Sequence, residues 1–218
     1  MKKTAIALAL MVSATGAQAA LLADSNLSIT QGTGGFTEPA AGTGSWFAME
    51  ALGPGGWVYT GIGGINGINL GTSQAASGAT AGEGIEAAVG NIDAAWTFFG
   101  SYGVHQTTSP MTVISDTGTG SAVLDFSGWD VSWNNVASIS MGGSGTATIT
   151  CANTCEDGDT YTLDYATNVP SDSANFPGVA YQLHLEGVVS AVPVPAAVWL
   201  FGSGLVGLAG IARRRKTA

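Results

Sequence analysis

An alternation of apolar and polar residues in the second half of the chain constrains the fold more than any other feature. In residues 179–186, Val, Tyr, Leu and Leu alternate with Ala, Gln, His and Glu. The same period of two recurs in residues 161–165 and 147–151, and it is typical of strands with one buried face. We therefore expect an antiparallel β domain in this part of the chain.

The apolar positions change phase within residues 121–135. Leu124 and Phe126 occupy even positions, whereas Trp129, Val131 and Trp133 occupy odd positions. A shift of one residue moves every side chain to the opposite face of a strand. The segment Ser127–Gly128 therefore predicts a bulge or a corner between two sheets.

The first half of the chain shows shorter patterns separated by glycine clusters. Residues 25–32, 44–52 and 56–62 are typical of short strands, residues 83–95 of a short helix, and residues 95–106 of one strand. Many short strands with Gly-rich turns favour an all-β fold, either an antiparallel β-sandwich or a jelly-roll-like single domain. Long helices are expected only at the two termini.

Residues 1–19 have the pattern of a signal peptide. Lys2 and Lys3 precede an uncharged apolar run over residues 5–12, and Ala17-Gln18-Ala19 supplies small residues for cleavage after Ala19. The alternative is a short membrane anchor, but the apolar run is too short to span a bilayer. We therefore expect an export signal handled by signal peptidase.

Residues 191–218 have the pattern of a second membrane-directed segment. Residues 196–212 carry no charge, and as a helix they would cover about 26 Å, the lower limit for spanning a bilayer. Four basic residues follow and should remain cytoplasmic: Arg213, Arg214, Arg215 and Lys216. The N-terminal side of the helix is then outside, so residues 20–190 are expected to form an extracytoplasmic β domain.

The proline motif, the glycine-bearing helix and the terminal basic residues together resemble the PEP-CTERM class of sorting signals, and especially its VPLPA-type variant. Val194 stands where the parent Pro-Glu-Pro pattern has Glu. The resemblance implies a membrane-embedded exosortase as partner, an inner-membrane-anchored precursor, and a final place at the cell surface or in the extracellular matrix of a Gram-negative bacterium. The resemblance covers about 27 residues and implies where the protein is sorted, but it implies no activity. It assigns the sorting motif to Val192, Pro193, Val194, Pro195 and Ala196.

The charges are separated along the chain. All six Lys and Arg residues lie in the two terminal segments, and all fifteen acidic residues lie between Asp24 and Glu186. The central region therefore carries a formal charge of −15, against −9 for the whole chain. Without basic side chains it has no means of neutralising phosphates, which excludes nucleic acid as a partner, and it cannot use lysine as a nucleophile.

The only two cysteines are Cys151 and Cys155. In an exported protein we expect them to form a disulfide that closes a five-residue loop and stabilises the fold by roughly 2 kcal/mol. The neighbouring residues Glu156, Asp157 and Asp159 form the densest acidic cluster and are a candidate for a weak calcium site. The alternative is a solvated turn, and no other cofactor is expected.

Catalytic motifs are sparse in the central region. Asp116-Thr117-Gly118 matches the triplet of aspartic proteases, but that chemistry needs two facing copies, and Asp-Thr-Gly between strands is also ordinary turn chemistry. His105 and His184 are the only histidines, and no nucleophile elbow accompanies them. His184 falls on the polar face of its strand.

Three tryptophans are candidates for stacking on sugar rings. Trp46, Trp57 and Trp96 lie in the Gly-rich half of the chain, although tryptophans in such a domain are more often part of the core. We therefore expect a non-catalytic surface or matrix protein associated with exopolysaccharide or biofilm. The alternatives are a carbohydrate-binding or calcium-dependent adhesin module, with an extracellular polysaccharide as partner, and a secreted hydrolase that uses carboxylates.

Overall fold

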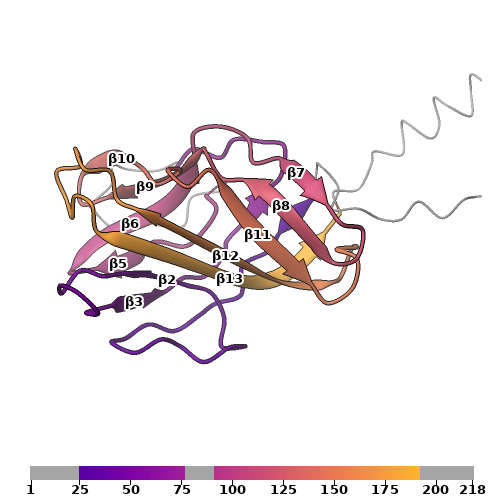
Figure 1. The fold of residues 1–218 in the computed structure, drawn as a ribbon, viewed down its shortest axis with the longest axis horizontal. Coiled ribbons are helices and arrows are strands. Elements are labelled where there is room, and N and C mark those ends of the chain that lie inside the picture. The colour runs from indigo at the N-terminus through magenta and orange to yellow at the C-terminus, as the bar shows by residue number, and fades with distance from the viewer. Residues whose placement is uncertain (1–24, 77–90, 192–218) are drawn as a thin grey trace, which may run out of the picture.

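The computed structural model describes residues 25–76 and 91–191. Within these ranges the chain forms thirteen strands and no helix, and every pair of strands is antiparallel (Figure 1). The predicted all-β class is confirmed, and two sheets around a common core are consistent with a β-sandwich. The predicted signal peptide and the sorting segment from residue 192 onward lie outside the described residues.

The larger sheet contains nine strands. Its path is β3-β2-β13-β12-β11-β8-β7, and β1 pairs with β13 and with β4. The strands are β1 (Asn26–Leu27), β2 (Trp46–Met49), β3 (Val58–Gly61), β4 (Ile68–Asn69), β7 (Val113–Asp116), β8 (Ser121–Asp125), β11 (Thr146–Cys151), β12 (Thr160–Asn168) and β13 (Ala180–Ser190).

Strand β13 is the longest strand and lies in the middle of this sheet. It pairs with β12 from Ala180 to Val188 on one side, and with β2 and β1 on the other side. Its predicted alternation is confirmed, because Tyr181, Leu183 and Leu185 are buried and the residues between them are half-buried. Two segments far apart in the sequence, β1–β2 and β12, are thus held together by one strand.

The smaller sheet has the order β10-β9-β6-β5. Its strands are β5 (Trp96–Phe98), β6 (Ser101–Thr107), β9 (Trp129–Trp133) and β10 (Val136–Ser140). The expectation of one strand over residues 95–106 is wrong, because β5 and β6 are a hairpin. Phe99 and Gly100 both have positive φ, 48° and 79°, as a two-residue hairpin turn requires.

The predicted helix over residues 83–95 is described only at its end. Residues 91–95 are not helical. Asp93 forms a β-bridge with Gly64 instead, and its side chain enters the core, where it is fully buried. The helix prediction is therefore wrong for these residues.

The predicted corner at Ser127–Gly128 is confirmed. Strand β8 belongs to the larger sheet and β9 to the smaller sheet, and Trp129 N donates to the carbonyl of Phe126 across a tight turn (2.9 Å). The change of phase in the apolar pattern therefore marks the point where the chain crosses from one sheet to the other.

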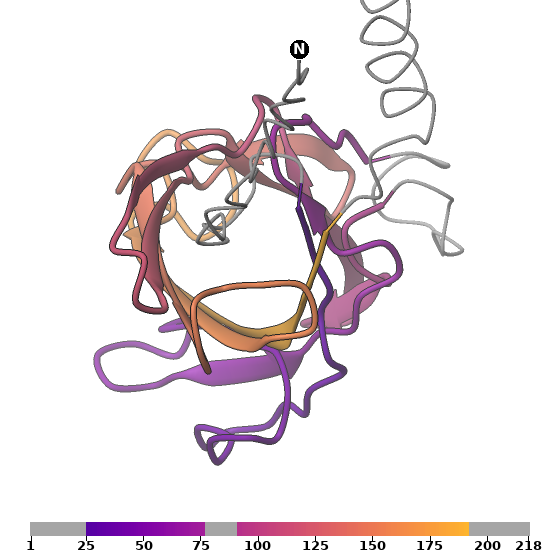
Figure 2. The same cartoon turned by 90° about the vertical axis from the view of Figure 1, so that its right-hand side faces the viewer.

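The core lies between the two sheets, which curve around it when viewed from one end (Figure 2). Phe47 and Leu183 of the larger sheet and Trp129 of the smaller sheet belong to one cluster of buried side chains. Burial of such side chains contributes about 1.5–3 kcal/mol each. Ion pairs of Lys or Arg do not add to this stabilisation, because the described residues contain no Lys and no Arg.

Candidate functional site

The outward face of the larger sheet carries the polar residues of β12 and β13. Because side chains alternate along a strand, Gln182 and His184 point away from the core. The register places Gln182 beside Ala166 and His184 beside Asp164. The predicted position of His184 on the polar face of its strand is confirmed.

Aromatic side chains extend this face across β2 and β3. The Trp46 ring stacks on His184 with ring centroids 5.4 Å apart, and the edge of Tyr59 meets Trp46 at 5.1 Å. Trp46 is only 7% exposed, whereas Tyr59 and the nearby Trp57 are half-buried. An aromatic surface thus lies next to the polar side chains of β13.

The segment of residues 33–44 is held against this face by Glu186. Gly42 N donates to Glu186 Oε1 (2.7 Å), and Gly44 N donates to Oε2 (3.0 Å). Burial tends to raise the pKa of Glu186, but these two N–H donors and His184 outweigh it and leave the pKa below its usual value. The carboxylate form of Glu186 is therefore the one that holds the segment.

His184 lies between two carboxylates. Its Nδ1 is 2.7 Å from Asp164 Oδ1, and its Nε2 is 3.2 Å from Glu186 Oε1. The hydrogen bond with Asp164, opposed by burial and supported by Glu186, raises the pKa of His184 above its usual value. The protonated imidazole is thus favoured, and both carboxylates compensate its charge.

Three neighbouring depressions lie on this face, and we call them together the outer-face groove. Their volumes are about 460, 690 and 520 Å³. The first and second share Ala166 and Gln182, and the first and third share Ala41 and His184. Glu38 and Trp57 lie along the border of the groove, and residues of β12 and β13 form its floor. The groove is a site of suitable size for an extended ligand.

The three tryptophans that are candidates for sugar stacking have different positions. Trp57 and Trp46 border the outer-face groove. Trp96 is buried in the core, where its ring lies 4.6 Å from that of Phe47. The stacking interpretation therefore applies only to the first two, and the core interpretation applies to Trp96.

A buried polar chain crosses the core beneath the groove, and the sequence patterns did not indicate it. Asp93 Oδ2 lies 2.5 Å from His105 Nδ1 and accepts a hydrogen bond from Trp96 Nε1 (3.1 Å). His105 Nε2 in turn lies 3.0 Å from the hydroxyl of Tyr181. Asp93, His105 and Tyr181 are all at most 2% exposed. The rings of Phe47, Trp96 and Trp129 surround His105, so the chain is part of the core.

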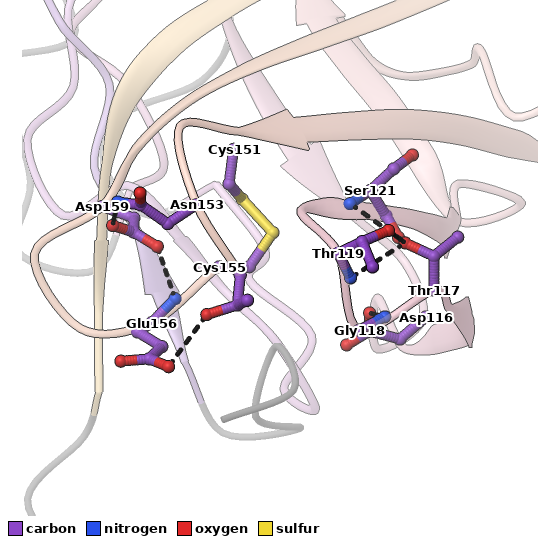
Figure 3. Close-up of a disulfide and its surroundings, with 11 residues drawn as sticks. Asp116, Thr117, Gly118, Thr119, Ser121, Cys151, Asn153, Cys155, Glu156 and Asp159 are labelled. Atoms are coloured by element: carbon purple, nitrogen blue, oxygen red, sulfur yellow. Dashed lines mark hydrogen bonds between the residues drawn. A yellow bond between two sulfur atoms is a disulfide. The ribbon is translucent and has the colours of Figure 1, made fainter. Parts of the chain in front are cut away.

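The disulfide between Cys151 and Cys155 is present and follows the end of β11 (Figure 3). Both cysteines are buried. The Gly120 carbonyl accepts a hydrogen bond from Cys151 N (2.7 Å), which joins the disulfide turn to the β7–β8 turn beside it. The pair is structural, as predicted.

The acidic residues after the disulfide are held by separate donors. Asp159 accepts hydrogen bonds from Asn153 Nδ2 (2.6 Å) and Glu156 N (2.9 Å), as Figure 3 shows, and the Asn153 bond is the main cause of the lowered pKa of Asp159. Asp157 Oδ1 accepts from Ala191 N (2.9 Å). Over residues 25–76 and 91–191, no three His, Cys, Asp or Glu side chains are arranged to hold a metal ion. The calcium site stays a prediction.

The Asp-Thr-Gly triplet forms the turn between β7 and β8. Asp116 Oδ1 accepts a hydrogen bond from Gly118 N (2.7 Å), and Thr117 Oγ1 donates to the carbonyl of Ser121 (2.8 Å) (Figure 3). Gly118 has a positive φ of 67°. These contacts are those of a hairpin turn, so the turn interpretation of the triplet is confirmed.

The sorting motif Val192–Ala196 and the basic residues Arg213–Lys216 lie outside the described residues. Over the part of the chain that is described, no helix is long and apolar enough to cross a bilayer. No family model matches the chain, and no curated protein or solved structure matches it significantly.

Proposed function

We propose that the chain is an exported, non-catalytic surface or matrix protein of a Gram-negative bacterium, sorted by an exosortase and associated with exopolysaccharide or biofilm. The observation that carries this proposal is the order of elements in residues 192–218, with a proline motif, an uncharged stretch and a terminal basic cluster. The N-terminal pattern of residues 1–19 agrees with the same topology.

The distribution of charge supports this proposal. Removal of both terminal segments leaves a domain with acidic side chains and no Lys or Arg. Such a domain repels polyanions and stays soluble. An all-β domain held by apolar burial and one disulfide is also typical of proteins that work outside the cell.

The sorting proposal is tested by the mass of the mature protein. The full chain is expressed in a Gram-negative host with and without an exosortase, and the surface-released product is analysed by mass spectrometry. We expect a product that lacks Arg213–Ala218 only when the enzyme is present. A Pro193→Ala/Pro195→Ala variant is expected to remain unprocessed. An intact C-terminus in cells that contain the enzyme contradicts the proposal.

A carbohydrate-binding module is the second candidate function, and the outer-face groove favours it. The groove combines the half-buried ring of Trp57 and an edge of the buried Trp46 with an amide, carboxylates and an imidazole, which is the mixture of groups that sugar recognition uses. In this proposal the two sheets form a jelly-roll-like sandwich that carries its ligand on one outer face. The calcium-dependent adhesin remains a variant of this candidate.

The groove gives less support to a carboxylate hydrolase. That chemistry needs one carboxyl group with a raised pKa as general acid beside an ionised one. The pKa of Glu186 is lowered, and both of its oxygens accept hydrogen bonds from backbone N–H groups. Glu186 is therefore held as a structural carboxylate.

A further inference from the structure

We propose that the outer-face groove binds a glycan chain whose sugars carry free, protonated amino groups. This inference rests on the glycan-binding function proposed above and adds the chemical class of the glycan. It follows from the shape of the groove, the side chains that line it, and the charge of the face on which it lies. The groove runs over β12 and β13 and is bordered by Trp46 of β2 and by Trp57, which precedes β3. Strands β12 and β13 lie at the front of Figure 1.

The shape of the groove suits an extended polymer. The first depression shares lining residues with each of the other two, and all three are open to solvent. Trp57 borders the second depression. The ring of Tyr59 makes an edge contact with Trp46, which lines the first depression. The half-buried indole ring of Trp57 offers a flat apolar surface on which the apolar face of a sugar can pack.

Gln182 supplies a hydrogen-bonding group at the centre of the groove. It lines both the first and the second depression and is half-buried. Within the described residues its amide makes no hydrogen bond to the protein, unlike the neighbouring His184, which contacts two carboxylates. A half-buried amide gains from a ligand that offers both donors and acceptors, as sugar hydroxyl and amino groups do.

The charge of the face selects the kind of sugar. Glu38 and Asp164 line the first depression from different elements, and the side chain of Asp164 is 75% exposed. The described ranges contain every acidic residue of the chain except Asp24, Glu83 and Glu86, and they contain no Lys or Arg. Protonated His184 does not change this, since Asp164 and Glu186 both contact it. The groove therefore repels uronate or sulfate groups and attracts ammonium groups.

The test is calorimetric binding of two oligosaccharides of equal length to the full-length chain in mild detergent. One probe is an oligomer of glucosamine and the other is the fully N-acetylated oligomer. Both are measured at a mildly acidic pH, at which the amino groups of the first probe are protonated. We expect the amino form to bind at least about tenfold more tightly, because a charge-assisted hydrogen bond replaces a neutral one.

Matched variants separate the groove from general attraction to an acidic protein. Trp57→Ala leaves the charge unchanged and is expected to weaken binding about five- to tenfold, whereas Trp57→Phe retains most of the affinity. Asp164→Asn is expected to reduce the preference for the amino form. Asp157→Asn removes the same charge from a residue that lines none of the three depressions, and is expected to leave the preference unchanged.

Each outcome decides a different part of the argument. If the acetylated oligomer binds as tightly as the amino form and Trp57→Ala abolishes both, the glycan-binding function stands and the amino-sugar inference is overturned. If neither oligomer binds, the glycan-binding function and the amino-sugar inference are both contradicted. If the amino form binds equally well to wild type and Trp57→Ala, the attraction is a property of the whole acidic surface and the groove is not the site.

Discussion

His105 and Asp93 form a fully buried pair between the two sheets, with Nδ1 of the imidazole 2.5 Å from Oδ2 of the carboxylate. The other carboxylate oxygen accepts a hydrogen bond from the backbone N–H of His105 (2.9 Å). Asp93 thereby ties the segment after residue 90 to β6. Buried polar groups of this kind are costly unless every partner is present.

Replacement of Asp93 by Ala is expected to lower the free energy of unfolding by about 3–5 kcal/mol. The change removes the partner of the His105 ring and of the His105 backbone N–H, and the carboxylate partner of Trp96 Nε1. The measurement is the midpoint of urea unfolding. Tyr181→Phe, which removes one hydroxyl beside His105, should cost only about 1–3 kcal/mol. Equal losses in the two variants would contradict this ranking.

The stability of the domain is expected to depend on pH through His184. Its pKa is raised in the folded state from the ordinary value of 6.5, first by Asp164 and against the effect of burial. The folded state therefore binds the proton more tightly, so this stabilisation is fully present below pH 6.5 and is lost as the pH rises through the higher folded pKa.

Thermal unfolding of wild type and His184→Gln over this pH range measures the effect. The melting temperature of wild type should fall by a few degrees more than that of the variant as the pH rises. Asp164→Asn should also reduce the pH dependence, since it weakens the hydrogen bond that raises the pKa. Parallel curves for wild type and both variants would exclude His184 as the titrating group.

The Cys151–Cys155 disulfide is expected to contribute roughly 2 kcal/mol, because the loop that it closes is short. A Cys151→Ser/Cys155→Ser variant should unfold at a correspondingly lower urea concentration. Reduction of the wild-type protein should have the same effect, and reduction of the variant should have none. A loss well above this magnitude would indicate that the buried sulfurs contribute through packing as well.

Gly44 is expected to be less tolerant of alanine than Gly42, although both donate to Glu186 and both have positive φ, 94° and 80°. A Cβ at Gly44 would overlap the Gln31 carbonyl, whereas a Cβ at Gly42 meets nothing within 4 Å. Gly42→Ala should cost about 1 kcal/mol from backbone strain alone. Gly44→Ala should lower the free energy of unfolding by about 1–3 kcal/mol more than Gly42→Ala does. It should also release the segment of residues 33–44 from the face of the sheet. Faster hydrogen exchange of the Gly42 amide, which donates to Glu186, measures this release.

Strands β11, β12 and β13 are predictable from the sequence because each has one buried face and one outward face. Burial in β11 and β12 alternates residue by residue, so the period of two is visible in the sequence. Strand β6 behaves differently, since His105, Gln106 and Thr107 are all buried. A strand covered on both faces loses its alternation, and its polar residues depend on partners distant in sequence, such as Asp130 for Gln106.

The candidate site was predictable only in part. The alternation within β13 predicts the position of His184, and the sequence makes Trp57 a candidate for stacking on sugars. The groove itself depends on pairings over long sequence separations, such as that of Trp46 with His184 across β2 and β13. The contact of Glu186 with Gly42 and Gly44 likewise links residues more than 140 positions apart, and no local pattern reports such a contact.

The pairing of Asn26 with Ser190 has a mechanical consequence. A tether that continues beyond residue 191 would pull on β13 along its own length. Strand β13 is bonded to β12 on one side and to β1 and β2 on the other, and antiparallel hydrogen bonds lie perpendicular to the strand. A pull along the strand therefore loads these hydrogen bonds in shear. Many of the hydrogen bonds must break together before the domain unfolds. In the anchored precursor that we propose, the last strand before the membrane segment is also the strand best placed to carry tension.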